Sequence, residues 1–304
     1  MSSRVDITMR QLRYFLAAAE HGQFSQAAIK VHVSQSAITT AVSQLETILA
    51  VQLFERQPHG VRLTAEGHKF RQHARHILDT LQDAVTQPSF LSHSLNGTVR
   101  IGASYTVLGY YLPTLLARFK RNYPQVEIDL VDMDRIAIEQ GISDTSLDLG
   151  LTIISNADIN QPFERHVLMR SRRQLWLATE HPLMNVESIS LAEIAEYAYI
   201  LATVDEGESS AMRYWRSANL EPRIAFRTSS MEALRGLVAY GFGVTILSDM
   251  LYRPWSLEGR KIEARPITDA IPPMELGLIW HSSVGLSQVA KAFQQFIISA
   301  NDLG

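Results

Sequence analysis

The sequence predicts a helical N-terminal part of about ninety residues, followed by an α/β region of about two hundred residues. Two observations predict the first part: two short helical patterns start only a few residues apart within 24–46, and a heptad pattern follows from residue 64. A third observation predicts the second part, because strand patterns alternate with helix patterns from residue 98 onward. Such alternation is typical of α/β folds with mostly parallel sheets.

The composition is that of a globular protein and excludes several kinds of site. Apolar residues make up 46% of the chain and charged residues 19%, which is typical of packed domains rather than disordered segments. The absence of cysteine excludes disulfides, thiolate metal sites and cysteine nucleophiles. Neither a run of about 18 apolar residues nor a secretory signal is visible, so we expect a cytoplasmic protein with no membrane partner.

The first expected helix has one apolar face and ends before Gly22, a residue typical of helix C-termini. The face residues recur at spacings of three and four: Leu12, Phe15, Leu16 and Ala19. Phe24 and Ser25 then predict a hydrophobic staple and an N-cap for a second helix, with Ile29 placed to meet Phe24.

The third expected helix begins after Val33 and Ser34, which repeat the staple and the cap. Its apolar stripe consists of Ile38, Ala41, Val42, Leu45, Ile48 and Leu49. The opposite face is short, polar and uncharged: Gln35, Ser36, Thr39, Thr40 and Ser43. Two helices joined by so short a turn form a helix-turn-helix, and a polar face of this kind fits the major groove of DNA. The pattern alone leaves open a small helical bundle with a solvated face.

Residues 10–67 resemble the DNA-binding domain of LysR-type transcriptional regulators. The matching landmarks, in order, are RQLRYF, GQFSQAA, VSQSAI, QLE, LFER and VRLTAEG. The resemblance implies a winged helix-turn-helix over 1–64, with a recognition helix at about 35–49 and a wing at about 55–64. The residues expected to contact DNA are those of the polar face with its cap, and one arginine of the wing: Ser34, Gln35, Ser36, Thr39, Thr40, Ser43 and Arg56.

One position departs from the family pattern. Many family members carry an arginine where Thr40 stands, after a serine where Thr39 stands. Loss of that charge removes about one phosphate or guanine contact, which lowers the affinity and reduces the salt slope by roughly one unit. The departure therefore concerns base preference and leaves the expected fold unchanged.

A long helix is expected to begin at Thr64 and to occupy the segment 65–90, with Glu66 in its first turn favouring the helix dipole. Apolar residues recur at spacings of four and three in a short heptad seam: Phe70, Ala74, Ile77, Leu81 and Ala84. The first four of them are the expected dimerisation contacts. The alternative is a helix that packs on its own domain, but the segment 86–97 is typical of an exposed hinge rather than a packing partner. The family resemblance also implies that this helix pairs two chains, which places two recognition helices about 34 Å apart.

From residue 98 the expected elements alternate. The expected strands are 99–102, 126–131, 147–154, 173–179, 199–202, 224–228 and 243–247, and the expected helices are 109–122, 134–141, 190–196, 209–219 and 231–240. Two of these helix starts carry capping boxes, Ser190 with Glu193 and Ser229 with Glu232.

Residues 91–304 are similar to the effector-binding domain of the same family, a two-lobed α/β fold like that of periplasmic binding proteins. The landmarks are GTVRIGAS, FKRNYPQVEIDL, LDLGLTI and LVAYGFGVTIL. In such folds a ligand lies between the lobes, at strand ends and helix N-termini. The resemblance implies lobe one at 98–165 and 272–304 and lobe two at 168–268, with crossovers near 165–168 and 266–272.

Polar residues at strand ends are the candidate effector contacts: Ser104, Tyr105, Thr106, Met133, Thr203, Asp205, Thr228 and Thr245. The hydroxyls of Ser104 and Thr106, with the N–H groups of the helix that follows, suit an anion, typically a carboxylate. The alternative is that these two residues only cap the helix. Asp205 is expected in a solvated acidic loop; if it enters the cleft, it argues against a simple monoacid and for a ligand bearing an amine or many hydroxyls.

No motif supports catalysis. The segment 207–211 (GESSA) lacks the strand and elbow of a hydrolase nucleophile, and 241–243 (GFG) lacks the third glycine of a dinucleotide fingerprint. Neither a phosphate loop nor an HExxH motif occurs, and His73 and His76 have no further ligand type beside them, so solvated histidines are expected. We therefore expect no enzyme activity, no cofactor and no metal.

The predicted function is sequence-specific transcriptional regulation modulated by a small metabolite. The expected partners are the double-stranded DNA of a promoter operator, a small-molecule effector, further copies of the chain in a dimer or tetramer, and RNA polymerase. The effector would act through different affinities for two states of the protein. The alternative is a DNA-binding assembly protein whose C-terminal domain only oligomerises and binds no ligand.

Overall fold

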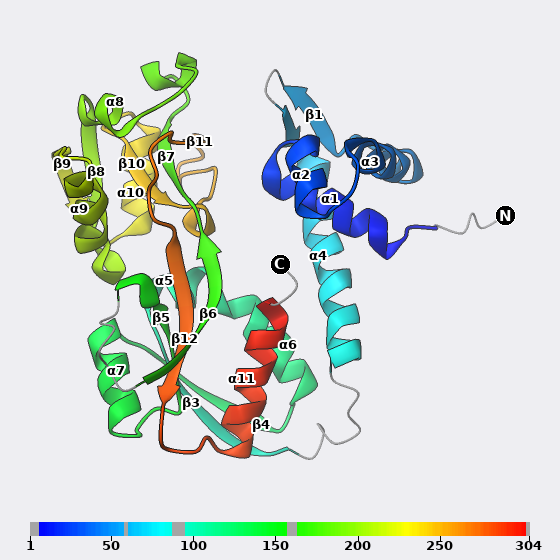
Figure 1. Ribbon diagram of the computed structural model, residues 1–304, viewed down its shortest axis with the longest axis vertical. Coiled ribbons are helices and arrows are strands. Elements are labelled where there is room, and N and C mark those ends of the chain that lie inside the picture. The colour runs from blue at the N-terminus through cyan, green and yellow to red at the C-terminus, as the bar shows by residue number, and fades with distance from the viewer. Residues whose placement is uncertain (1–5, 58–59, 87–94, 157–162, 302–304) are drawn as a thin grey trace. The chain divides into compact units, whose positions relative to one another are not determined.

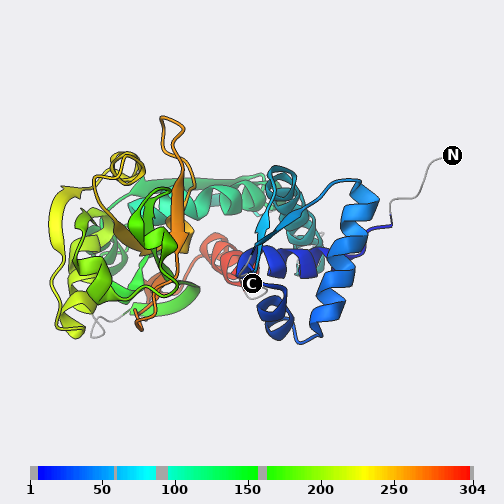
Figure 2. The ribbon, with the colours of Figure 1, turned by 90° about the horizontal axis from the view of Figure 1, so that it is seen from above.

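The computed structural model describes residues 6–57, 60–86, 95–156 and 163–301, and the chain divides into two compact units, Met1–Ser89 and Phe90–Gly304 (Figure 1). In its described residues the first unit consists of α1 (Met9–His21), α2 (Phe24–Lys30), α3 (Gln35–Leu49), β1 (Phe54–Gln57), β2 (Gly60–Leu63) and α4 (Ala65–Thr86). Helix α3 lies across α1 rather than alongside it (Figure 1, Figure 2). The predicted three helices, the wing and the long helix are all present.

Capping residues set where two of these helices begin. Thr8 and Gln11 form a reciprocal capping box at the start of α1. Ser34 accepts a hydrogen bond from the backbone N–H of Ala37 at the start of α3, which confirms the predicted cap. Recognition of that serine is why the expected boundaries of α3, 35–49, agree with the structure.

The staple and the cap predicted at Phe24 and Ser25 are wrong. Helix α2 already begins at Phe24, its N-cap residue Gln23 makes no side-chain capping bond, and Ile29 is 68% exposed. Phe24 instead packs edge-on against Phe54 of β1, with ring centroids 5.5 Å apart. The hairpin offers an aromatic partner for the Phe24 ring, so tertiary packing overrides the local motif.

The described residues of the second unit form two lobes, each made of strands and helices. The first sheet has the strand order β4-β3-β5-β12-β6. We call it, with its helices, lobe one: β3 (Gly97–Ala103), α5 (Tyr105–Tyr110), α6 (Leu112–Asn122), β4 (Val126–Asp132), α7 (Arg135–Ser143), β5 (Leu149–Ile153), η2 (Ile154–Asn156), β6 (Phe163–Ser171), β12 (Met274–His281) and α11 (Gln288–Asn301).

Lobe two is built around the strands β10-β7-β11 and the pair β8-β9, which an isolated bridge between Tyr199 and Val244 connects. Its elements are β7 (Arg173–Ala178), η3 (Pro182–Asn185), α8 (Leu191–Ala195), β8 (Ala198–Ala202), η4 (Val204–Glu206), α9 (Gly207–Ser217), β9 (Arg223–Thr228), α10 (Met231–Ala239), β10 (Thr245–Ser248), η5 (Asp249–Leu251) and β11 (Ile262–Arg265).

Both lobes combine parallel and antiparallel strand pairs, which corrects the expectation of mostly parallel sheets. Strand β3 runs parallel to β4 and β5, but β12 runs antiparallel to β5 and β6. In lobe two, β8 and β9 are parallel while β7 is antiparallel to β10 and β11. Strand β12 returns from lobe two and therefore runs against its neighbours (Figure 1). Strand β6 stays paired with β12 up to Ser171, so the first crossover lies at Arg172, beyond the predicted 165–168.

The helix predicted at 109–122 is interrupted. Helix α5 ends at Tyr110 and α6 starts at Leu112, and Tyr111 between them has φ −121° and ψ −50°. Pro113 lacks the N–H that a continuous helix needs at this point, so the chain restarts as a new helix. Strands β6, β11 and β12 and helix α11 were not among the expected elements.

The two predicted capping boxes have different outcomes. Ser190 and Glu193 form the expected reciprocal box at the start of α8. At α10 the cap is Ser230, whose hydroxyl accepts from Ala233 N, rather than Ser229. The helix starts at Met231, and an N-cap residue directly precedes the first helical residue.

Aromatic side chains pack neighbouring elements together in the core of each lobe. In lobe one, Phe119 of α6 packs edge-on against Phe293 and Phe296 of α11, with centroids 4.8 and 5.4 Å apart. In lobe two, Trp215 of α9 packs edge-on against Tyr199 of β8 at 5.5 Å. Among the residues that the structure describes, no helix is long and apolar enough to cross a membrane.

Candidate DNA-binding and effector sites

Helix α3 presents the polar face that the sequence predicts. Its opposite stripe is buried: Ile38, Ala41, Val42 and Leu45. Its polar side is exposed: Ser34, Gln35, Ser36, Thr40 and Ser43. Thr39 is half-buried and donates its hydroxyl proton to the carbonyl of Gln35 at 3.0 Å, so its lone pairs and methyl group remain for other contacts. An uncharged polar face suits base edges better than phosphates.

Two residues that sequence reasoning missed hold α3 in place. The Oε1 of Glu46 accepts hydrogen bonds from the backbone N–H groups of Leu53, at 2.7 Å, and Phe54, at 3.1 Å. The Oε1 of Gln44 accepts from Nε2 of Gln11 on α1 at 2.9 Å. Both residues lie in the QLE landmark of the sequence, but only the fold determines which groups they bond to.

The hairpin of β1 and β2 forms the predicted wing. Arg56 is exposed on β1, opposite Val61 on β2. The N–H of Val61 donates to the backbone carbonyl at the C-terminal cap of α1 at 2.7 Å, which fixes the wing against the helices. The wing tip at 58–59 and most of the hinge expected at 86–97 lie outside the described residues.

Helix α4 does not expose all four of the expected dimerisation contacts. Ala74 is fully buried and Phe70 packs edge-on against Phe15 at 5.0 Å, so these two belong to the core of their own unit. The prediction is wrong for Ala74, because a side chain buried within its own unit cannot contact a second chain, whereas Phe70 is half-buried. Ile77 and Leu81 are 41% and 37% exposed and lie one turn apart. Packing on its own domain thus accounts for Ala74 and in part for Phe70, while Ile77 and Leu81 stay exposed.

Three predicted effector residues meet where the two lobes touch. Ser104 and Thr106 follow β3 and are 1% and 3% exposed. The N–H of Thr106, expected to receive an effector carboxylate, instead donates to Oδ2 of Asp205 at 2.7 Å. Asp205 lies in η4 of lobe two, so it is not part of a solvated loop. Ser104 occupies the N-cap position of α5 without a side-chain capping bond, and its Oγ has no hydrogen-bond partner among the described residues.

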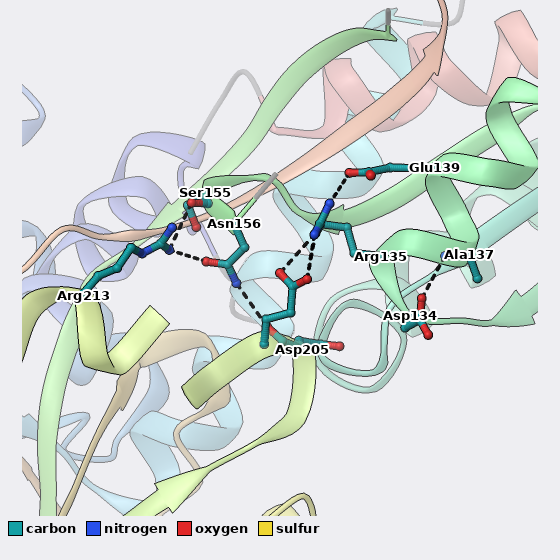
Figure 3. A network of polar contacts seen from close by, with 9 residues as sticks. Asp134, Arg135, Ala137, Glu139, Ser155, Asn156, Asp205 and Arg213 are labelled. Carbon is teal, nitrogen blue, oxygen red and sulfur yellow. Dashed lines mark hydrogen bonds and ion pairs between the residues drawn. The ribbon is translucent and has the colours of Figure 1, made fainter. Parts of the chain in front are cut away.

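The residue after Asp205 makes an ion pair across the same interface (Figure 3). Arg135 of α7 donates from Nε to the carboxylate of Glu206 at 3.0 and 3.1 Å, and from Nη2 at 2.8 Å. Its Nη1 donates to Glu139 at 2.6 Å. These bonds, those that Arg135 donates to Glu206 foremost, raise the pKa of Arg135 above its usual range, so the guanidinium stays charged.

A second chain of bonds runs beside this pair (Figure 3). Asn156 of η2 donates from Nδ2 to the backbone carbonyl of Asp205 at 3.1 Å. Arg213 of α9 donates to Oδ1 of Asn156 at 2.5 Å and to the carbonyl of Ser155 at 3.2 Å. Sequence reasoning identified neither Asn156 nor Arg213, and it also missed the ion pair of Arg135, whose partner in lobe two lies 71 residues away.

The other five predicted effector residues have different surroundings. Met133 packs against a small apolar cluster of lobe one. The N–H of Thr203 donates to the carbonyl of Thr228 at 3.0 Å, so the backbones of these two residues are joined within lobe two. Thr245 is 1% exposed in β10, and its Oγ1 has no hydrogen-bond partner among the described residues. Tyr105 is half-buried, and this burial raises the pKa of its hydroxyl.

Comparison with known proteins accounts for both parts of the chain. Residues 92–302 match the family described as LysR substrate binding domain, and residues 9–68 match the bacterial regulatory helix-turn-helix protein, lysR family. The RuBisCO operon transcriptional regulator of Allochromatium vinosum is 27% identical over 294 residues, which cover 96% of each chain. The HTH-type regulator YnfL of Escherichia coli (strain K12) is 27% identical over 302 residues, covering 97% of this chain and 99% of the relative.

A solved structure agrees with these matches. The crystal structure of HinK, a LysR family transcriptional regulator from Pseudomonas aeruginosa, superimposes with a TM-score of 0.63 at 28% identity, covering 98% of this chain and 99% of that one. The predicted fold class is thereby confirmed, an N-terminal helix-turn-helix followed by a mixed α/β domain. These relatives are transcriptional regulators rather than enzymes. The chain belongs to the LysR family and is a DNA-binding transcriptional regulator with a C-terminal effector-binding domain.

Proposed function

We propose that the protein reads operator DNA by placing α3 in the major groove. The observation that carries this proposal is the exposed, uncharged polar face of α3, which stands opposite a buried apolar stripe. Gln35 and Ser36, in the first turn, would contact base edges first, and Thr40 and Ser43 would follow one turn later. Arg56 in the wing would contact the phosphate backbone or the minor groove, which adds affinity with little sequence information.

The second element of the proposal is a symmetric assembly. Ile77 and Leu81 on α4 are exposed apolar side chains, and we infer that they pair two chains in a dimer or in a tetramer made of such dimers. The domains would then be 1–64 for DNA binding, 65–90 for pairing and 91–304 for effector binding. Two recognition helices would face successive major grooves, about 34 Å apart.

The third element is a small metabolite bound between the two lobes, near Ser104 and Thr106. Its support is the buried Ser104 hydroxyl, which lacks a partner among the described residues at the place where the lobes meet. A buried polar group left without a hydrogen bond costs about 1–3 kcal/mol, so a ligand that bonds to it gains affinity. Binding to promoter DNA makes RNA polymerase the expected further partner and the cytoplasm the expected location.

The DNA proposal is tested by fluorescence anisotropy of the full chain on a site selected from random DNA by the wild-type protein, and on unselected DNA. Gln35→Ala and Ser36→Ala should reduce the preference for the selected site. Arg56→Ala should weaken both DNAs alike and reduce the salt slope by about one. Thr47→Ala, on the last turn of α3 and exposed, is the matched control. Equal losses on both DNAs for Gln35→Ala would contradict the proposed orientation of α3.

A ligand-free assembly role is the second candidate, and one observation favours it: the lobes are joined by their own side chains. A thermal-shift screen of the full chain against a metabolite panel separates the two candidates. A ligand at 100 times its Kd adds about 2.7 kcal/mol of stability. The effector proposal requires at least one hit that Ser104→Ala weakens and the exposed control Ser143→Ala does not. A folded, DNA-binding protein with no hit would favour the assembly role.

A further inference from the structure

Two consecutive residues at the lobe interface have left-handed backbone conformations. Asp205 has φ 47° and ψ 44°, and Glu206 has φ 60° and ψ 28°. Non-glycine residues in this region cost free energy and persist only where surrounding contacts hold them. Here contacts with lobe one do so. The Asp205 carboxylate accepts from the N–H of Thr106. The Glu206 carboxylate accepts from Arg135 (Figure 3).

Both contacts place a carboxylate on a hydrogen-bond donor of lobe one. The Thr106 N–H lies 2.7 Å from Asp205 Oδ2, and Nη2 of Arg135 lies 2.8 Å from Glu206 Oε1. The side chains of Arg135 and Glu206 are 17% and 32% exposed, so their pair is shielded from water more than a surface ion pair. One dipeptide of lobe two thus fills two donors of lobe one, as a small molecule with two carboxylates would.

The closed arrangement leaves a nearby group unsatisfied. A serine at an N-cap normally accepts the N–H of the second or third helical residue. Thr106 is the second residue of α5, and Asp205 takes its N–H. The Ser104 Oγ is left buried and has no partner among the described residues. Departure of Asp205 would therefore free the Thr106 N–H and the Ser104 hydroxyl, and both groups can donate to an anionic oxygen of a ligand.

We propose that Asp205 and Glu206 form a clasp, a tethered dicarboxylate that closes the two lobes in the absence of effector. The class of effector that competes with the clasp is a small dicarboxylate anion. This inference rests on the proposed effector site between the lobes and names its ligand class.

The clasp distinguishes between classes of ligand. A monocarboxylate replaces only one of the two carboxylates and leaves the other to hold the lobes together. The position of Asp205 between the lobes was expected to favour a ligand with an amine, but its carboxylate already accepts from Thr106. A cationic amine therefore pairs with the clasp without displacing it, so the lobes stay as they are. A dicarboxylate replaces both carboxylates of the clasp and also accepts from the Ser104 hydroxyl. Of the three ligand classes, only a dicarboxylate therefore gives an acceptor to every donor that the clasp leaves.

The test measures the distance between the lobes in the full chain. The chain has no cysteine, so Ser143→Cys on α7 and Ser217→Cys on α9, both exposed, take spin labels selectively. Labelled protein is diluted into unlabelled chain so that only distances within one chain are measured. The clasp is removed by Asp205→Ala with Glu206→Ala, and separately by Asp205→Asn with Glu206→Gln, which keeps the side-chain shapes and leaves asparagine at a left-handed position that it tolerates.

The control for a lost acidic side chain is Glu208→Ala, because Glu208 pairs with Arg227 inside lobe two at 3.4 Å. The ligand probes are the sodium salts of linear dicarboxylates from malonate to adipate. Their controls are butyrate, putrescine and sodium chloride at equal ionic strength. Concentrations reach tens of millimolar, because tethered groups have an effective concentration on the order of millimolar.

We expect both clasp variants to raise the population of the longer distance at least about tenfold, the change that one lost charge-assisted bond supports. Glu208→Ala should match the intact chain. At least one dicarboxylate should lengthen the distance in the intact chain and leave the clasp variants unchanged. Unaltered distances in both clasp variants would overturn the clasp. Opening by butyrate or putrescine, or by no member of the series, would overturn the ligand class. A thermal-shift hit that Ser104→Ala weakens, together with retained DNA binding in the anisotropy assay, separates either failure from failure of the proposed function.

Discussion

Removing the Glu46 carboxylate should destabilise the DNA-binding unit more than any other single change on α3 outside its buried stripe. Its Oε1 accepts from the N–H groups of Leu53 and Phe54, which are 0% and 8% exposed. Glu46→Ala leaves both N–H groups inside the unit without that acceptor, at a cost of about 1–3 kcal/mol each. With partial relaxation we expect a loss of about 2–4 kcal/mol in the free energy of unfolding. Glu46→Gln keeps an acceptor oxygen without its charge and should lose about 1 kcal/mol.

The assay is urea unfolding of the full chain, combined with amide hydrogen exchange at Leu53 and Phe54. Exchange at these two amides reports the loss of the Glu46 bonds directly, whereas the unfolding transition reports their free energy. Thr47→Ala is the matched control, since Thr47 is exposed on the same turn and should change stability by less than about 0.5 kcal/mol. A Glu46→Ala protein within about 0.5 kcal/mol of wild type, with unchanged exchange at both amides, would refute the role assigned to these bonds.

Three further outcomes are expected. Ile77→Asp with Leu81→Asp should convert the assembly to monomers, measured by sedimentation, while the circular dichroism of the helices is retained. The reason is that the two exposed apolar side chains would pack against the partner chain, and charged aspartates cannot. Burial lowers the pKa of His181, whose neutral Nδ1 accepts a hydrogen bond from the N–H of Leu183. The unfolded state therefore binds a proton at His181 more readily than the folded state does. The contribution of His181 to the stability of the folded state is complete above about pH 6.5 and falls below it. His181→Asn keeps an acceptor that does not titrate, and its Tm should fall less than that of wild type between about pH 7 and pH 5. Gly60→Ala should destabilise the wing by about 2 kcal/mol or more, measured by urea unfolding, because φ is 150° and a Cβ would clash with a backbone carbonyl.

The DNA-binding unit could be predicted closely where its signals are local. The start of α3 follows from Ser34, and the end of α1 follows from Gly22, whose φ is 65° at the cap. The prediction failed where two local readings compete for one side chain. Phe24 fits a staple by spacing but packs on the wing, and Phe70 fits a dimer seam but packs on Phe15. Heptad and staple patterns predict that a side chain packs against another apolar group, but they do not predict which group that is.

The effector-binding part could be predicted only in outline. Ser104, Thr106 and Asp205 were each identified as strand-end residues, yet the bond between Thr106 and Asp205 spans 99 residues of sequence. Arg135 lies in the first turn of a short helix, where an arginine usually faces water. Its burial depends on η4 arriving from the other lobe, and no periodicity within α7 encodes that arrival.

The two ends of α5 are held by lobe two in different ways, and the difference indicates where the lobes part. At its C-terminal end, the hydroxyl of Tyr110 accepts from Arg235 at 2.6 Å, and the same Arg235 nitrogen donates to the carbonyl of Leu251 at 3.0 Å. Arg235 is 6% exposed and anchored to the backbone of its own lobe. At the N-terminal end, Thr106 is held by Asp205, which has a left-handed backbone. Because the strained contact costs more to keep, we expect any separation of the lobes under the proposed clasp to begin at Asp205, with Tyr110 still attached as the pivot.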